Sequence, residues 1–285
     1  MKKIVIIPNL IKDKGLAVTS NIARRLSELG YSLYIDSSVG EIKGAGVCLY
    51  DDVPNDADMI VVIGGDGSVI DASRMAIELD IPLLGVNLGK VGYLSEIEPE
   101  NTDVFKDLSE GRYSVEEKML LSAEYRKSNG ETVVSERLAV NDVVISQDGY
   151  FGIADFTVEN SRSETVSYRG NGVIIATPVG STAYSLSAGG PVIAHNLDSI
   201  TVTPVCPHSF FNRSIVYEPD ERICVKNVGD LSLNISVDGR NFAVLSKGEE
   251  CRITKSKHKL KMITFSRSNM FSALFKKIKL FEDKN

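Results

Sequence analysis

Two stretches of the chain place glycines and hydroxyl groups where they could bind a phosphate or a sugar. The first, Gly64-Gly65-Asp66-Gly67-Ser68, directly follows the apolar run 59–63. Glycines let a ligand approach the backbone closely, and the helix expected after them offers free N–H groups to an anion. Taken alone, the loop is also typical of a tight strand-to-helix turn in which Asp66 caps the helix.

The second stretch, residues 172–191, passes from a strand into a Pro-Gly turn and then into a short helix opened by Ser181 or Thr182. Two glycines and a proline end that helix. Small hydroxyl residues packed this densely leave room for a ligand and supply donors and acceptors to it. The alternative interpretation is a Ser/Thr-rich connector without a ligand.

A third element is the dipeptide Asn141-Asp142 ahead of the strand 143–145, which by itself is typical of a turn. Two common nucleotide-binding templates are absent. No Gly-x-x-x-x-Gly-Lys-Ser/Thr occurs, and the 64–68 loop lacks the third glycine of the dinucleotide fingerprint. The four cysteines and three histidines show no metal-ligand spacing, so we predict no metal site built from protein side chains alone.

The first hundred residues alternate between strand and helix patterns, and the elements that these patterns predict position the glycine loop. Apolar periodicity predicts strands over 3–7, 31–35, 59–63 and 81–86, and helices over 16–29 and 68–77. Strand, helix and strand joined by short connections indicate an α/β domain with a parallel sheet. Ligands of such sheets bind at the carboxyl ends of the strands, where the glycine loop is expected.

From about residue 113 the pattern changes to short β-rich segments separated by turn residues, including an Asn-Gly hairpin signal at 129–130. Only 181–188 and 270–280 are helical in pattern there. We therefore predict an α/β N-terminal domain with a parallel sheet plus an all-β, sandwich-like C-terminal domain. The predicted limits are 1–112 and 113–266.

Composition and charge narrow the classes of partner. A chain of 285 residues is long enough for two domains of ordinary size or one large one, and its 43% hydrophobic and 25% charged content is average for soluble globular proteins. A net charge of −6 argues against a nucleic-acid partner. No apolar run approaches the 18 or so residues that span a bilayer, and the apolar start is too short for a signal peptide. We expect a cytoplasmic protein with no nucleic-acid or membrane partner.

The motifs together resemble those of the NAD kinases, which phosphorylate the 2′-hydroxyl of the adenosine ribose of NAD to make NADP. The resemblance extends over most of the chain, and is carried by residues 64–68, 85–94, 141–142, 177–191, 204–209 and 236–239. The Gly-Gly-Asp-Gly motif is shared with diacylglycerol kinases, sphingosine kinases and phosphofructokinases. The Thr-Pro-x-Gly-Ser-Thr-Ala-Tyr segment is far more specific.

The resemblance implies that Asp66 is the general base that takes the ribose proton as the hydroxyl attacks the γ-phosphorus of ATP. It implies that Gly64, Gly65 and Gly67 hold phosphates through their N–H groups, with Mg²⁺ or another divalent cation accompanying ATP and NAD as the acceptor substrate. The implied contacts to the nucleotides come from Tyr93, Asn141, Asp142, Arg169, Asn171, Thr182, Ala183, Tyr184, Ser187 and Arg240.

The resemblance also implies an active site between the two domains, a C-terminal segment 267–285 that packs on the first domain, and a homodimer or homotetramer. Four positions depart from the usual pattern of the family. This chain has Tyr93 where phenylalanine is frequent, Asp142 where glutamate is usual, Asn171 where an acid is common and Val179 where threonine is frequent. Asparagine at 171 keeps an acceptor but loses the charge. Two alternatives stay open, a lipid kinase and a dinucleotide-binding sensor without turnover.

Overall fold

The computed structural model describes residues 2–42, 46–89, 92–95, 97–147, 152–265, 274, 275 and 279. The chain forms two compact units. Unit 1 comprises the residues up to Glu117 together with the chain from Leu260 onward, and unit 2 comprises Lys118–Lys259. The domain limits drawn from the sequence stay a prediction. The expected return of 267–285, and the helix expected over 270–280, lie outside the described residues except at 274, 275 and 279.

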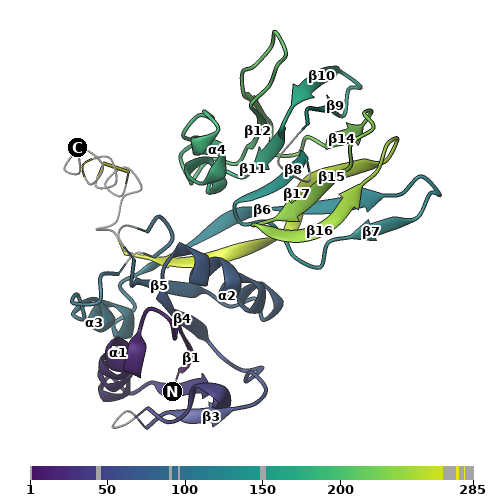
Figure 1. Ribbon diagram of the computed structural model, residues 1–285. Helices are drawn as coiled ribbons and strands as arrows, with labels where there is room; N and C mark the ends of the chain where they lie inside the picture. Colours follow the sequence, from purple (N-terminus) through teal and green to yellow (C-terminus); the bar gives the residue numbers. More distant parts are fainter. Residues whose placement is uncertain are drawn as a thin grey trace. The chain divides into compact units, whose positions relative to one another are not determined.

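Unit 1 is an α/β unit built on a parallel sheet in the order β3-β2-β1-β4-β5 (Figure 1). Every residue of β4 and β5 is buried, as expected of parallel strands that are covered on both faces. The elements are β1 (Lys3–Pro8), η1 (Lys14–Leu16), α1 (Ala17–Glu28), β2 (Ser32–Asp36), η2 (Ser37–Val39), β3 (Cys48–Tyr50), β4 (Met59–Gly64), α2 (Asp66–Glu78), β5 (Leu83–Asn87) and α3 (Val104–Ser109).

Two strands have residues in both units: β6 (Ser114–Arg126) and β17 (Glu250–Thr264). The remaining elements belong to unit 2. They are β7 (Thr132–Val134), β8 (Asp142–Gln147), β9 (Ala154–Glu159), β10 (Thr165–Gly170), β11 (Gly172–Ala176), η3 (Gly180–Thr182), α4 (Tyr184–Ser187), β12 (Ile200–Val205), β13 (Ile215–Tyr217), β14 (Ile223–Asn227), β15 (Leu233–Val237) and β16 (Arg240–Leu245).

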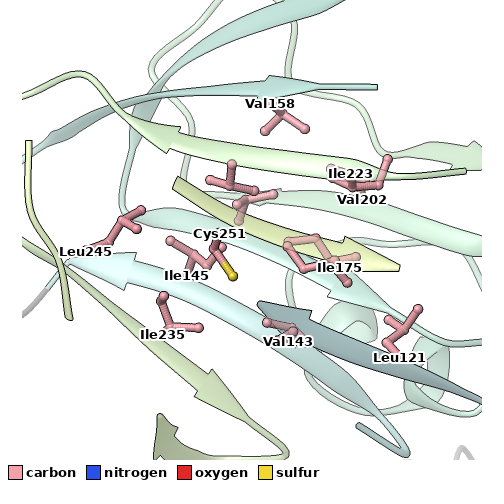
Figure 2. Packing of buried hydrophobic residues seen from close by; sticks show 14 of the residues in the cluster. Leu121, Val143, Ile145, Val158, Ile175, Val202, Ile223, Ile235, Leu245 and Cys251 are labelled. Atoms are coloured by element: carbon pink, nitrogen blue, oxygen red, sulfur yellow. The ribbon is translucent and has the colours of Figure 1, made fainter. Parts of the chain in front are cut away.

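Unit 2 is a two-layer β structure. One layer is an antiparallel sheet in the order β13-β12-β11-β8-β15-β16, and the other contains β10-β9-β14-β17 with β6 and β7. Figure 2 shows Val158 and Ile223 of the second layer in one apolar cluster with Ile145, Ile175 and Ile235 of the first. Alternate residues of β9 and β15 are buried, as expected of strands with one face in such a core.

The predicted fold class, a parallel α/β domain plus an all-β sandwich, is confirmed. One local prediction is wrong. The helix expected over 181–188 is divided into the 3-10 turn η3 and the single α-helical turn α4, because Ala183 between them has φ −103° and ψ −124°. Ser181 and Thr182 therefore lie inside η3 and cap neither turn with their side chains.

Candidate active site

Side chains crowd both of the first two positions of the turn between β4 and α2, more severely at Gly64 than at Gly65, where the neighbour is the end of a flexible lysine. A Cβ on Gly64 would lie 2.4 Å from the Ser68 hydroxyl oxygen, and a Cβ on Gly65 would lie 2.6 Å from Nζ of Lys12. Both glycines are buried, whereas Gly67 is exposed in the first turn of α2. The helix begins at Asp66 with Gly65 as its N-cap residue, and no side chain caps it. The interpretation of Asp66 as a helix cap is therefore wrong.

The carboxylate of Asp66 is instead held by a different loop. It accepts the backbone N–H groups of Tyr93, Leu94 and Ser95 at 2.9, 3.1 and 3.3 Å. Gly92 must be small there, because a Cβ on it would lie 2.7 Å from Asp66 Oδ1. Backbone donors from the loop after β5 therefore fix the orientation of the acid at the end of β4.

Tyr93 also has its side chain in this region and is partly buried. Burial raises the pKa of its phenol above the ordinary value, and the Asp66 carboxylate raises it further. The phenol therefore stays neutral near pH 7 and keeps its hydroxyl donor. The structure places Tyr93 beside Asp66, so these two predicted site residues lie together in unit 1.

Two asparagines at the ends of β1 and β5 lie at the same edge of the sheet, although neither was among the predicted site residues. Nδ2 of Asn9 donates to the Ser68 hydroxyl at 2.8 Å, and Oδ1 of Asn87 accepts the Gly89 N–H at 2.8 Å. Each asparagine lies at the end of a strand that neighbours β4. Their positions at carboxyl ends of parallel strands were the available signal.

Unit 2 contains the second group of predicted site residues, centred on Asn141 and Asp142 where β8 begins. The carboxylate of Asp238 accepts the backbone N–H groups of Val140, Asn141 and Asp142 at 2.8, 2.8 and 3.1 Å. Asp238 returns a bond from its own N–H to the carbonyl of Asp142 at 3.0 Å. A side chain almost a hundred residues away in sequence therefore fixes this dipeptide.

The Thr-Pro-Val-Gly turn holds the other side of the Asn141 backbone. The N–H of Thr177 donates to the carbonyl of Asn141 at 2.8 Å, and the Thr177 hydroxyl donates to the carbonyl of Val140 at 2.6 Å. Gly180 is required, because a Cβ on it would lie 2.0 Å from the Asn141 carbonyl oxygen. The motif therefore serves to pack one loop tightly on another.

Asp142 and Asp238 lie close together at the 140–142 loop. Burial is the main cause that raises the pKa of Asp142 to about 7, and the nearby Asp238 carboxylate raises it further. Burial also raises the pKa of Asp238 above its ordinary value, although its three backbone donors act in the opposite direction. The pair can therefore bind a proton near neutral pH, with Asp142 as the residue that gains it.

The hydroxyl segment follows Gly180 and brings further predicted residues to this end of β8. Thr182 is 9% exposed and its hydroxyl donates to the Val179 carbonyl at 3.0 Å. Tyr184 is 46% exposed, and Ser187 is also exposed. The hydroxyl of Thr182 is thus engaged locally, whereas the side chains of Tyr184 and Ser187 in α4 are accessible. Ala183, between the two turns, is partly buried.

Arg240 belongs to the same end of the sheet. It pairs with Val237, which pairs with Val143 of β8, and its side chain is exposed. Asp238, which holds the Asn141 loop, lies in the turn between Val237 and Arg240. The structure therefore brings Arg240 toward the site through this hairpin.

Arg169 and Asn171 lie elsewhere. The backbone carbonyl of Asn171 accepts the N–H of Gln147, which is the last residue of β8. Asn141 precedes the first residue of β8. At the rise of an extended strand the two ends are about 20 Å apart. Arg169 is exposed on β10, 3.8 Å from a carboxylate oxygen of Asp155. These two predicted residues are therefore not brought together with Asn141 and Asp142 in one copy of the chain.

The described residues contain no group of three or more His, Cys, Asp or Glu side chains that could hold a metal ion. Nor is any described helix long and apolar enough to cross a membrane.

Comparison with known proteins connects these features to one family. The profile of the ATP-NAD kinase N-terminal domain matches residues 4–113, and that of the C-terminal domain matches residues 124–265. This chain belongs to the NAD kinase family. The resemblance and the enzyme class predicted from the sequence are thereby confirmed.

Relatives within the NAD kinase family align over nearly their full length. The NAD kinases of Natranaerobius thermophilus and Geobacter sulfurreducens are each 35% identical to this chain. The alignments cover 98% of this chain, and 98% and 99% of the respective relatives.

Two solved structures share the fold. A yeast NADH kinase complexed with NADH gives a TM-score of 0.82 at 21% identity, covering 96% of this chain and 86% of the other. An NAD kinase from Archaeoglobus fulgidus in complex with ATP gives 0.74 at 24% identity, covering 97% and 98%. At these identities the likeness supports the NAD kinase fold and not the individual contacts.

Proposed function

We propose that this chain transfers the γ-phosphoryl group of ATP to the 2′-hydroxyl of the adenosine ribose of NAD, which yields NADP and ADP. The observation that carries the proposal is the position of Asp66. It lies at the start of α2, directly after two buried glycines, with its carboxylate oriented by the loop that follows β5. Family membership supports the same reaction.

In the proposed step, the 2′-oxygen forms a bond to the γ-phosphorus while the bond from that phosphorus to the β–γ bridging oxygen breaks. The hydroxyl proton passes to the carboxylate of Asp66, and ADP leaves with the bridging oxygen. A positioned base of this kind contributes about 10²–10⁴-fold to the rate. The backbone donors on Asp66 restrict its rotation, which supports a defined approach to the hydroxyl.

The phosphates of ATP are assigned to the N-terminus of α2. The first N–H groups of a helix have no partner within the helix, and the helix dipole favours negative charge there. Gly64, Gly65 and Gly67 allow the phosphates to approach those groups. Because no cluster of metal-ligating side chains occurs among the described residues, we assign Mg²⁺ to the substrate, as MgATP. The cation would reduce the charge on the transferred phosphate.

The ribose that accepts the phosphate is assigned to Asn141 and Asp142. An amide and a carboxylate suit paired hydroxyl groups, and Asp238 fixes their backbone from below. Thr182, Ala183, Tyr184, Ser187 and Arg240 are proposed to line the dinucleotide site at this end of β8. The proposal includes a homo-oligomer in which another copy supplies Arg169 and Asn171, and a cytoplasmic location.

The test is NADP formation from NAD and MgATP by the purified protein, read with an NADP-specific dehydrogenase. A signal that requires both ATP and NAD supports the proposal. If NAD binds but no phosphate is transferred, the sensor alternative replaces it. If NAD does not bind and the protein associates with phospholipid vesicles, the lipid-kinase alternative replaces it. Running NADH beside NAD in the same assay identifies the preferred acceptor.

A further inference from the structure

Lys12 lies at the edge of the parallel sheet where β1, β4 and β5 end. Its Nζ atom is 2.6 Å from the place that a Cβ on Gly65 would occupy and 3.6 Å from the equivalent place on Gly89. The ammonium group is therefore beside both glycine turns, the one after β4 and the one after β5. Lys12 takes no part in the proton transfer proposed for Asp66.

The backbone of Lys12 is held firmly. Oδ1 of Asn9 accepts the Lys12 N–H at 3.0 Å, while Nδ2 of Asn9 donates to the Ser68 hydroxyl in α2 at 2.8 Å. On the other side, the buried Asp13 accepts the N–H of Thr19 in α1 at 2.8 Å. The loop that carries Lys12 is thus fixed to both α1 and α2, which keeps the exposed Lys12 side chain within reach of both glycine turns.

The charge of Lys12 is not balanced by a neighbouring acid. Among the described residues, no carboxylate lies within ion-pair distance of Lys12, and Asp66 is engaged by the N–H groups of the 93–95 loop. A cation beside a helix N-terminus is electrostatically unfavourable, because the exposed N–H groups are themselves the positive end of the helix dipole. An anion bound between the Lys12 ammonium and the first N–H groups of α2 would be attracted by both.

Asn87 provides a second, independent sign of a missing partner. The residue is only 2% exposed, and its Oδ1 accepts the Gly89 N–H. Its Nδ2 is buried with no hydrogen-bond partner in the described part of the chain. A buried donor without an acceptor is costly, so native proteins seldom leave one unsatisfied. Oδ1 of Asn87 and Nζ of Lys12 lie within 4 Å of the same point, the place of a Cβ on Gly89.

We propose that Lys12, together with Nδ2 of Asn87, binds the phosphate chain of the donor nucleotide over the N-terminus of α2. The identification of that phosphate as the donor of the transfer rests on the proposed function. Lys12 donates N–H bonds to phosphate oxygens and offsets the charge that develops on them, and forms no covalent bond. The acceptor ribose is assigned to Asn141 and Asp142, so Lys12 makes no proposed contact with it.

The kinetic test removes the charge of Lys12 and keeps a side chain of similar length. Lys12→Met is expected to lower kcat/KM for MgATP by about 10–100-fold, the usual effect of losing a hydrogen bond to a charged group. The KM for NAD is expected to stay unchanged. Lys12→Arg keeps the charge and is expected to recover most of the loss. Lys14→Met is the matched control, since Lys14 is an exposed lysine of the same loop and is expected to behave as wild type.

A binding test makes the result independent of turnover. Inorganic tripolyphosphate, titrated into the full chain in a calorimeter, is expected to bind the Lys12→Met variant at least 10-fold more weakly than the wild type. Asn87→Asp, which keeps the acceptor for Gly89 and removes the donor, is expected to weaken it as well. Thermal unfolding of each variant shows whether the fold is retained.

The two tests separate the possible failures. Equal tripolyphosphate affinity in wild type and Lys12→Met, or no binding by the wild type, overturns the proposal for Lys12. Lys12-dependent binding in a wild type that makes no NADP overturns the proposed function and leaves the phosphate site standing. Unchanged kcat/KM for MgATP in Lys12→Met, with an active wild type, removes Lys12 from the reaction.

Discussion

Asp66 and Asp142, the two acids of the proposed site, are held in opposite ways. Asp66 is partly buried and receives three backbone donors, whereas Asp142 is 5% exposed and lies next to a second carboxylate. The backbone donors fix the orientation of the Asp66 carboxylate, while burial beside another acid favours the protonated form of Asp142. The two residues therefore suit different tasks, which two predictions separate.

Asp66→Asn is expected to lower kcat by two or more orders of magnitude, because an amide cannot take up the ribose proton. The Kd for NAD is expected to stay within about threefold, since a base acts only as the proton is transferred. The measurements are steady-state rates with both substrates and calorimetric binding of NAD.

A purely structural role for Asp66 predicts a different result. Its carboxylate orders residues 93–95, so a variant that lost only this support would show a lower melting temperature and a raised KM for ATP with kcat largely kept. Thermal unfolding and the KM for ATP are therefore measured on the same sample. Near-normal kcat excludes Asp66 as the base.

Asp142 is expected to make the stability depend on pH. Its pKa of about 7 in the folded protein lies above the ordinary value of 3.8, so the folded chain binds more protons than the unfolded chain between these values. The free energy of unfolding therefore falls as pH rises from about 4 to about 7. Asp142→Asn cannot ionise, and its melting temperature is expected to exceed that of wild type increasingly over this range, by several degrees at pH 8.

Calorimetric melting curves between pH 4.5 and 8 check this expectation. Asp220→Asn, at an exposed site, is the control and is expected to follow the wild type at every pH. A constant difference between Asp142→Asn and wild type across the range would contradict a raised pKa for Asp142. The effect at pH 8 is on the order of a few kcal/mol.

At the scale of elements, the Thr-Pro-Val-Gly turn acts by close packing. Gly180→Ala would place a Cβ 2.0 Å from the Asn141 carbonyl oxygen, so the Asn141 loop or the turn must move. We expect a destabilisation of about 1–3 kcal/mol, as for overpacking in a core, and at least a 10-fold rise in the KM for NAD. Thermal unfolding and acceptor kinetics measure both.

Gly67→Ala is the matched substitution for stability. A Cβ on Gly67 meets nothing within 4 Å, and the residue lies in the first turn of α2. Alanine is the better helix former by about 1 kcal/mol, so this variant is expected to melt at a slightly higher temperature than wild type. If Gly180→Ala shared that gain, close packing would not be the reason for glycine at position 180.

The elements that the sequence predicted are those with a clear period. The continuous apolar run of β4 identifies it as a strand that is buried on both faces. The helical spacing of apolar residues in α1 identifies it as a helix that is buried along one stripe. The long strand β17 was not predicted. Its lysines at 255, 257, 259 and 261 suggest a solvated surface, whereas Ser256 and Leu260 within this run are buried. The lysine side chains on one face make the segment look polar in sequence, which obscured the strand pattern of the buried residues on the other face.

Residues of the candidate site could be proposed from the sequence where a motif is continuous, and not where their contacts are remote. Asp66 and Asn141 stand in recognisable motifs. The bonds from residues 93–95 to Asp66, and from residues 140–142 to Asp238, join segments 27–29 and 96–98 positions apart. Such pairings are set by sheet topology and leave no local pattern, and Lys12 was missed for the same reason.

At the scale of the whole molecule, the predicted dinucleotide contacts divide into two groups on unit 2. Asn141, Asp142 and the segment after Gly180 lie at one end of β8, and Arg169 and Asn171 lie at the other, about 20 Å away. One ribose cannot contact both groups of a single copy. If both groups bind the same ribose, a neighbouring copy must supply one of them, as a symmetric interface would allow.

Mixing two inactive variants tests this arrangement. Asn141→Ala and Arg169→Glu each remove one group, and each is expected to lower kcat/KM for NAD at least 10-fold in the pure oligomer. After dissociation and joint reassembly at equal amounts, a mixed dimer holds one site with both groups intact, so about a quarter of wild-type activity is expected to return. Light scattering establishes the oligomer, and mixing without dissociation is the control. Activity no higher than the mean of the two variants would show that each copy builds its site alone, and that Arg169 acts outside the dinucleotide site.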